Sequence, residues 1–220
     1  MQAFPILIRL VKKDLLIEWR MQQNLYGIMV YAVCTIFILY LAAGQPEATQ
    51  WNALFWTTQL FIVVNAVVKS FVGEPAGRYL YYYSVVSPGL FLGSRMILNV
   101  VYMVILGSIS LLLFRFFLGD PLVKSFAYWG ITLLGGTGLS LVFTMLSAIA
   151  SRARQQASLI AILGFPIIIP QLLLLIRLSK MALGEIFKEG VVWQPAGLLL
   201  CLDLLVIIMA SVLFPYIWKD

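Results

Sequence analysis

Six apolar runs separated by short polar connections constrain this chain more than any other feature of its sequence. We place the runs at about 24–43, 51–68, 96–118, 126–150, 157–177 and 195–217. About 20 helical residues cross the hydrocarbon core of a bilayer, so each run has the length of a transmembrane helix. With 62% of its residues hydrophobic and 11% charged, the chain has more apolar surface than a water-soluble domain can bury. The sequence therefore predicts an all-α integral membrane protein, with residues 1–220 forming one membrane domain.

The N-terminal segment, residues 4–21, differs from the six runs because charged residues are frequent in it. Leu7, Val11 and Leu15 recur every four residues, while Arg9 and Lys13 fall on other faces. This pattern is typical of an amphipathic helix that lies in the membrane interface rather than crossing the bilayer.

The longest polar interruption lies between the second and third runs, at residues 69–95. It combines charged residues, three consecutive tyrosines suited to a membrane–water boundary, and two proline-containing turns. One interpretation is a solvated connection, and the other is a coupling loop that a soluble partner binds. The candidate coupling residues are Glu74, Gly77, Arg78, Tyr81, Ser87 and Pro88.

Lysines and arginines predict the orientation, because they are enriched in cytoplasmic loops. An N-terminus on the inside places ten of the 15 lysines and arginines on the cytoplasmic side. Both termini are therefore predicted to be cytoplasmic, together with residues 69–95 and the short turn that holds Arg152 and Arg154.

Two of the predicted spans have unusual interiors. The fifth contains Pro166 and Pro170, and each proline removes a backbone donor, so we expect the helix to bend or break there. The sixth contains Asp203, an ionisable residue that is costly inside a membrane. An ion-paired or hydrogen-bonded carboxyl group is favoured for Asp203 over a transport residue.

Small and aromatic residues suggest packing roles. Glycines in the fourth span predict close helix approach, and tryptophans near the span ends predict an aromatic belt at the membrane surface. The glycines are Gly135, Gly136 and Gly138, and the tryptophans are Trp51, Trp56, Trp129, Trp193 and Trp218.

The chain lacks the residues on which most catalytic and metal sites depend. It has no histidine, so a Ser-His nucleophile is excluded and few haem ligands remain. No G-x-x-x-x-G-K-[ST] motif is present for ATP binding. Cys34 and Cys201 lie in apolar runs and are predicted to be buried free thiols. We predict a protein that is not an enzyme and has no catalytic, cofactor-binding or metal-binding residues of its own.

The order of these elements resembles the permeases of ABC exporters: a basic interfacial helix, two spans, a cytoplasmic E-P-x-G-R…S-P-G loop and four further spans. More specifically, GLSLVFTMLSAIASRARQQASLIAILGFPIIIPQLLL (138–174) resembles the haem exporter protein B (CcmB) family of bacterial cytochrome c maturation. The N-terminal KKDLLIEWR (12–20) is similar to the opening of that family as well. One departure from the family pattern is Asp203.

This resemblance implies a homodimer of this subunit in the bacterial inner membrane, associated with two copies of a separate ABC ATPase. It also implies a haem-handling membrane protein as a partner, and through it a periplasmic haem chaperone that is released, loaded with haem, when ATP is hydrolysed. ATP and haem would then be bound by the partners, with no cofactor held directly by this chain.

Three other functions are compatible with the sequence. The first is an ABC permease that exports another cargo, such as a lipid, a glycan or a drug. A secondary transporter would need paired ionisable residues at mid-membrane, and only Asp203 is available. A membrane scaffold without a transport cycle is the third.

Overall fold

A computed structural model describes residues 3–20, 23–68, 86–122, 124–151, 156–184 and 189–219 of the chain. These residues form helices, and the described part of the chain contains no strand. The helices are α1 (Ala3–Arg20), α2 (Gln23–Ala43), α3 (Ala48–Val67), α6 (Pro88–Leu118), α7 (Ser125–Ala150), α8 (Gln156–Leu183) and α9 (Glu189–Lys219).

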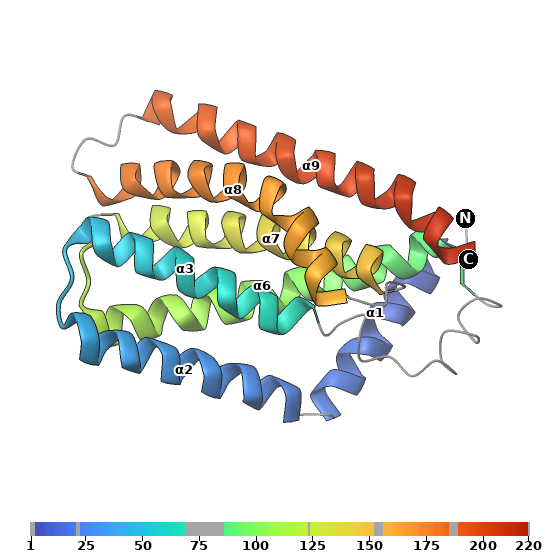
Figure 1. Ribbon diagram of the computed structural model, residues 1–220, viewed down its shortest axis with the longest axis horizontal. Helices are drawn as coiled ribbons and strands as arrows, with labels where there is room; N and C mark the ends of the chain where they lie inside the picture. Colours follow the sequence, from blue (N-terminus) through green and yellow to red (C-terminus); the bar gives the residue numbers. More distant parts are fainter. Residues whose placement is uncertain are drawn as a thin grey trace.

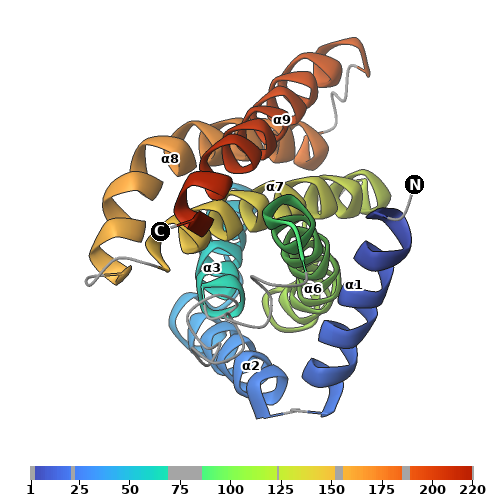
Figure 2. The ribbon, with the colours of Figure 1, turned by 90° about the vertical axis from the view of Figure 1, so that its right-hand side faces the viewer.

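The helices from α2 to α9 run back and forth along the long axis of one bundle, as Figure 1 shows. Both chain ends and the start of α6 lie at the same end of this bundle, which we call the terminal end. The connections from α2 to α3 and from α6 to α7 lie at the opposite end, as do the end of α8 and the start of α9. α2 and α9 lie on opposite sides of the bundle in both ribbon views (Figures 1 and 2).

Helix α1 crosses the terminal end instead of continuing the bundle. In Figure 2, which looks along the bundle, α3 and α6 are seen nearly end-on whereas α1 is seen from its side. It packs against α6, while Ile8, Leu15 and Leu16 are exposed. Exposed apolar residues on a helix in this position fit an interfacial helix, although its place in a membrane stays a prediction.

Five helices are long and apolar enough to cross a membrane: α2, α6, α7, α8 and α9. α3 has 20 residues, the length of a span, but it carries Asn52, Thr58 and Gln59 on its buried face. Asn52 and Gln59 bond to side chains of α7 and α6, and Thr58 Oγ1 donates to the Leu54 carbonyl of α3 itself. The low hydropathy of α3 therefore comes from polar groups that face the protein interior and not lipid. The all-α membrane class agrees with this structure, and a sixth span through α3 stays a prediction.

Helix α7 lies at the centre of the bundle. Its apolar stretch is 72% buried, against 17% for α2 and 22% for α8. It contacts α3, α6, α8 and α9, so a change in the position of α7 acts on most of the membrane domain.

The prediction of an aromatic belt is wrong for Trp51, Trp56 and Trp218, which are buried inside the structure. Trp51 packs against Phe55, Phe114 and Tyr128, with ring centroids 5.5 Å apart in each pair. A buried indole needs a partner for its N–H. Trp51 Nε1 donates to Gly119 O (3.2 Å), and Trp56 Nε1 donates to Ser179 Oγ (3.0 Å). These bonds allow the two rings to act as core residues.

The two cysteines also differ from the sequence prediction, because Cys34 on α2 and Cys201 on α9 are exposed. The described parts of α2 and α9 face outward over most of their length. An apolar run in a membrane bundle therefore does not imply that each of its side chains is covered by protein.

Candidate functional site

A strip of small and hydroxyl-bearing side chains runs along the buried faces of α7. It includes Thr132, Gly135, Ser140, Thr144 and Ser147. Small residues allow neighbouring helices to approach closely, and hydroxyl groups bond across or along the helices in an apolar environment. α7 therefore offers a polar centre to the helices around it.

Long-range hydrogen bonds between side chains attach α3 to α7, α8 and α6. Tyr128 Oη donates to Asn52 Oδ1 (2.8 Å), and Trp56 Nε1 reaches Ser179 of α8. Gln59 Nε2 donates to Ser110 Oγ of α6. Each bond joins α3 to a different helix, so α3 has a fixed rotation within the bundle.

Gly135 provides the space that Trp56 occupies. A Cβ atom at this position would lie 2.6 Å from Trp56 Cζ3 and 2.6 Å from Leu175 Cδ2. Real Cβ atoms do not approach other atoms that closely. The predicted close helix approach is thus confirmed at Gly135, whereas a Cβ at Gly136 would make ordinary contacts, 3.6 Å from Met103 O.

Asp203 lies in a buried contact between three helices. Gln171 Nε2 of α8 donates to Asp203 Oδ1 of α9 at 3.2 Å. A Cβ at Gly138 of α7 would come within 3.0 Å of both side chains. The sequence singled out Asp203 but not its partner, although Gln171 is the one polar side chain between Pro166 and Ile176 and directly follows Pro170.

Pro166 and Pro170 both lie inside α8, which is continuous from Gln156 to Leu183. Figure 1 shows that α8 changes direction partway along its length. The helix does not end at either proline, and both side chains are exposed. Gln171, which directly follows Pro170, meets Asp203 of α9.

A buried ionic contact joins α1 to α6 at the terminal end. Asp14 Oδ2 lies 3.8 Å from Arg95 Nε, and both residues are only 5% exposed. Lys13 Nζ lies 2.9 Å from Asp14 Oδ1 and adds a second positive charge. Two turns before Asp14 in α1, Cδ1 of Leu7 lies 3.5 Å from the place of a Cβ at Gly93. α1 is therefore held against the first turns of α6 by both charge and packing.

The same turns of α6 contact the end of α9. Arg95 Cζ lies 5.5 Å from the centroid of the Phe91 ring. That ring lies 5.0 Å from Trp218 and 6.3 Å from Phe214, centroid to centroid. We call the contact formed by Asp14, Phe91, Arg95, Phe214 and Trp218 the terminal junction. It links the first, fourth and last described helices.

α6 begins at Pro88, so residues 88–95 at the end of the predicted coupling loop are helical and include part of the terminal junction. Pro88 is the first residue of α6, a position that suits proline, and the carbonyl of Ser87 accepts bonds from the N–H groups of Leu90 and Phe91, both at 3.1 Å. The other candidate residues lie outside the described residues. They are Glu74, Gly77, Arg78 and Tyr81 of the loop and Arg152 and Arg154 of the second turn.

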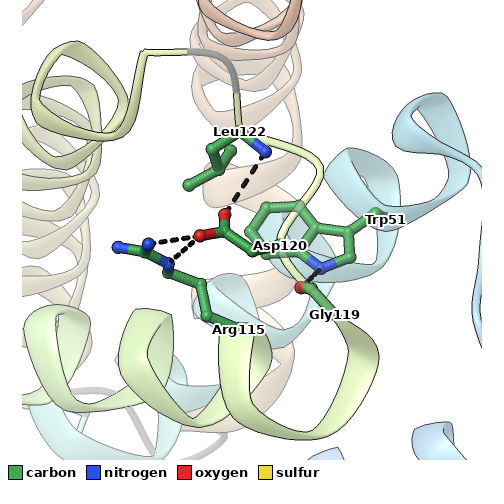
Figure 3. A network of polar contacts seen from close by, with 5 residues as sticks. All are labelled: Trp51, Arg115, Gly119, Asp120 and Leu122. Carbon is green, nitrogen blue, oxygen red and sulfur yellow. Dashed lines mark hydrogen bonds and ion pairs between the residues drawn. The ribbon is translucent and has the colours of Figure 1, made fainter.

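At the opposite end, the connection between α6 and α7 is held in place by the contacts in Figure 3. Arg115 Nε donates to Asp120 Oδ2 at 2.8 Å, and the Leu122 N–H donates to Asp120 Oδ1 at 3.3 Å. Gly119, whose φ of +82° favours glycine, accepts a hydrogen bond from Trp51 through its carbonyl.

An apolar groove of about 340 Å³ opens beside the connection between α6 and α7. It is lined by Ser108, Leu111, Leu112, Arg115, Ser125, Phe126 and Trp129.

Within the described residues there is no group of three or more histidine, cysteine, aspartate or glutamate side chains placed to hold a metal ion. Several described polar contacts instead join helices to one another. They suit a membrane domain that transmits movement between its helices.

Two residues of the terminal junction stand out in the sequence by their charge. Asp14 is an acidic residue flanked by basic ones in the N-terminal helix, and Arg95 stands at the start of an apolar run. No local pattern pairs them, because 81 residues separate them along the chain.

A family model described as "CcmB protein" matches residues 5–216, nearly the whole chain. No curated protein and no solved structure matches the chain.

Proposed function

This chain belongs to the CcmB family, the haem exporter protein B family, and is therefore a membrane component of an ABC transporter for cytochrome c maturation. From that premise we propose that it couples ATP hydrolysis to haem delivery. Hydrolysis takes place in a separate ATPase subunit, and this chain has no catalytic role. ATP hydrolysis leads to release of the haem-loaded periplasmic chaperone. The family and the five long apolar helices indicate a multi-pass protein of the inner membrane.

The terminal junction is the observation that supports coupling. The predicted coupling loop, 69–95, overlaps the start of α6 at Pro88, and Phe91 and Arg95 lie within about the first two turns of that helix. Those residues contact α1 and α9 directly. A force applied to the loop therefore acts on α6, which has 31 residues, and at the same time on the helices at the two ends of the chain.

The assembly that we propose contains two copies of this chain and two ATPase subunits. Each copy crosses the membrane six times, with α3 as the second span and both termini in the cytoplasm. Charged residues of the coupling loop, Glu74 and Arg78, orient the ATPase, since charge at an interface sets register and partner choice. The short turn with Arg152 and Arg154 lies on the same side. A haem-handling membrane protein binds the haem, and ATP is bound by the ATPase.

Co-purification tests this proposal. The tagged chain should retain its ATPase, and Arg78→Glu should weaken that retention and lower cytochrome c yield without changing membrane insertion. Arg177→Glu is the matched control, because this exposed arginine lies in the last third of α8, away from the coupling loop. Equal ATPase retention and cytochrome yield in the two variants would remove Arg78 from the interface.

The competing functions predict other results. Export of a different cargo predicts a bound ATPase but normal cytochrome c in cells that lack this chain. A scaffold predicts no effect of the chain on ATP hydrolysis by the purified complex.

A further inference from the structure

Asp203 occupies a position where a free charge is costly. It lies 14 residues after the start of α9 and 16 before its end, roughly 20 Å from either end of the helix. Only 7% of the residue is exposed. Among the described residues, no lysine or arginine lies within ion-pair distance of its carboxyl group.

The helices packed around Asp203 supply no compensating charge. α7 contains no lysine, arginine, aspartate or glutamate. Its titratable Tyr128 lies ten residues before Gly138 and bonds to Asn52 of α3. The charged residues of α8, Arg177 and Lys180, are exposed and lie six and nine residues beyond Gln171. Arg95 and Arg115 of α6 lie near the two ends of that helix, beside Asp14 and Asp120.

The neighbouring amide shows what the carboxyl group can bond. Gln171 is 1% exposed and donates through Nε2 to Asp203 Oδ1. Its other polar atom, Oε1, is buried and accepts no hydrogen bond from any described residue. An ionised carboxylate cannot satisfy that oxygen, because it only accepts hydrogen bonds, whereas a protonated carboxyl group has one O–H to donate. A carboxylic acid and a primary amide can thus satisfy each other with two bonds in one planar pair.

We propose that Asp203 is held as a neutral carboxylic acid and forms with Gln171 a proton-dependent clamp that joins α8 to α9 across Gly138 of α7. The proton is the ligand of this site, and it lies between the Asp203 carboxyl group and Gln171 Oε1. Neutrality removes the cost of burying a charge at this depth, and the second bond satisfies an acceptor that is otherwise left without a partner.

The glycine makes the clamp possible. A Cβ at Gly138 would come within 3.0 Å of both the amide nitrogen and the carboxyl oxygen, so any larger residue forces the pair apart. The clamp therefore ties three helices at one point. Loss of the proton leaves one bond in place of two and sets Gln171 Oε1 against a negative carboxylate, which loosens α9 from α8.

Replacement of the acid by its neutral isostere tests the clamp. Asp203→Asn keeps an amide that can both donate to and accept from Gln171, so we expect the purified complex to melt close to the wild-type temperature. Asp203→Leu removes both bonds, and we expect it to melt several degrees lower. The wild-type complex should lose stability relative to Asp203→Asn as the pH is raised, because the clamp exists only while the proton is bound.

Infrared difference spectra give an independent measurement. The wild-type complex minus Asp203→Asn should show the carbonyl stretch of a protonated carboxyl group, shifted in deuterated water. Absence of that band, or an Asp203→Asn variant that melts as low as Asp203→Leu, would overturn the proposal. Both readouts report on the helices themselves, so they are independent of whether the chain takes part in haem delivery.

Discussion

Asp14 Oδ2 of α1 lies 3.8 Å from Arg95 Nε of α6, and the two residues are among the least exposed charged side chains of the described part of the chain. They join an amphipathic helix to the helix that follows the coupling loop. A charge that is removed from water needs its partner, so the contact makes the position of α1 dependent on the position of α6.

Asp14→Asn should therefore destabilise the terminal junction. Loss of one partner of a buried ion pair costs about 3–5 kcal/mol, and the 3.8 Å separation places this pair near the lower end of that range. We expect a lower melting temperature of the purified complex and less cytochrome c formed per ATP hydrolysed. Lys13→Gln is the matched control. Its side chain is 37% exposed, so its loss should cost less than about 1 kcal/mol. Similar losses in the two variants would contradict a special role for the buried pair.

Gly135→Ala should disturb the contact between α7 and α3. The new methyl group would lie 2.6 Å from Trp56 Cζ3, and Trp56 cannot move without straining its bond to Ser179. Overpacking of this kind costs about 1–3 kcal/mol, measurable as a lower melting temperature in detergent. Gly130→Ala serves as the control on the same helix, because nothing lies within 4 Å of a Cβ there. A stable Gly135→Ala protein would show that α3 and α7 are not tightly packed.

The two prolines of α8 should matter more for function than for folding. Replacing both Pro166 and Pro170 by alanine restores two backbone donors and straightens the helix. Because Gln171 directly follows Pro170, a straighter helix moves it relative to Asp203. We expect cytochrome c yield to fall more than the amount of protein in the membrane. Normal yield in the double variant would make the change of direction incidental.

The membrane topology can be measured with single cysteines. Cys34 and Cys201 are both exposed, so both must first be replaced by alanine. Cysteines at Gln45, in the exposed connection between α2 and α3, and at Arg78 should then react with impermeant reagents from opposite sides. Reaction of both from one side would exclude α3 as a transmembrane helix.

Features of the structure that depend on neighbouring residues could be predicted from the sequence, whereas contacts between residues far apart in the chain could not. Hydropathy is local, so the long apolar helices were predictable, although α6 begins at Pro88, eight residues before the predicted start of the third span. The burial of Trp51 and Trp56 could not be predicted, because a tryptophan at the end of a span has the same sequence context whether its indole faces lipid or protein. Asp203 was identified as unusual, but its pairing with Gln171 depends on how α8 and α9 cross, which no local pattern records.

The last prediction concerns haem. A member of a haem exporter family invites a search for a haem site, yet the chain has no histidine, and its two cysteines lie on α2 and α9, on opposite sides of the bundle (Figures 1 and 2). Methionine and tyrosine are the axial ligands that remain. Arg115 is a basic residue that could meet a haem propionate, but its guanidinium already binds the carboxylate of Asp120 (Figure 3).

We therefore expect this chain, purified with its ATPase alone, to carry no stoichiometric haem, and the Soret band to appear only when the haem-handling partner is present. Asp120→Asn sharpens the test, because it frees the Arg115 guanidinium and should still yield a haem-free complex if the groove beside Arg115 is not a haem site. A full Soret band from the partner-free complex, lost on changing one methionine or tyrosine, would show that this subunit ligates haem itself.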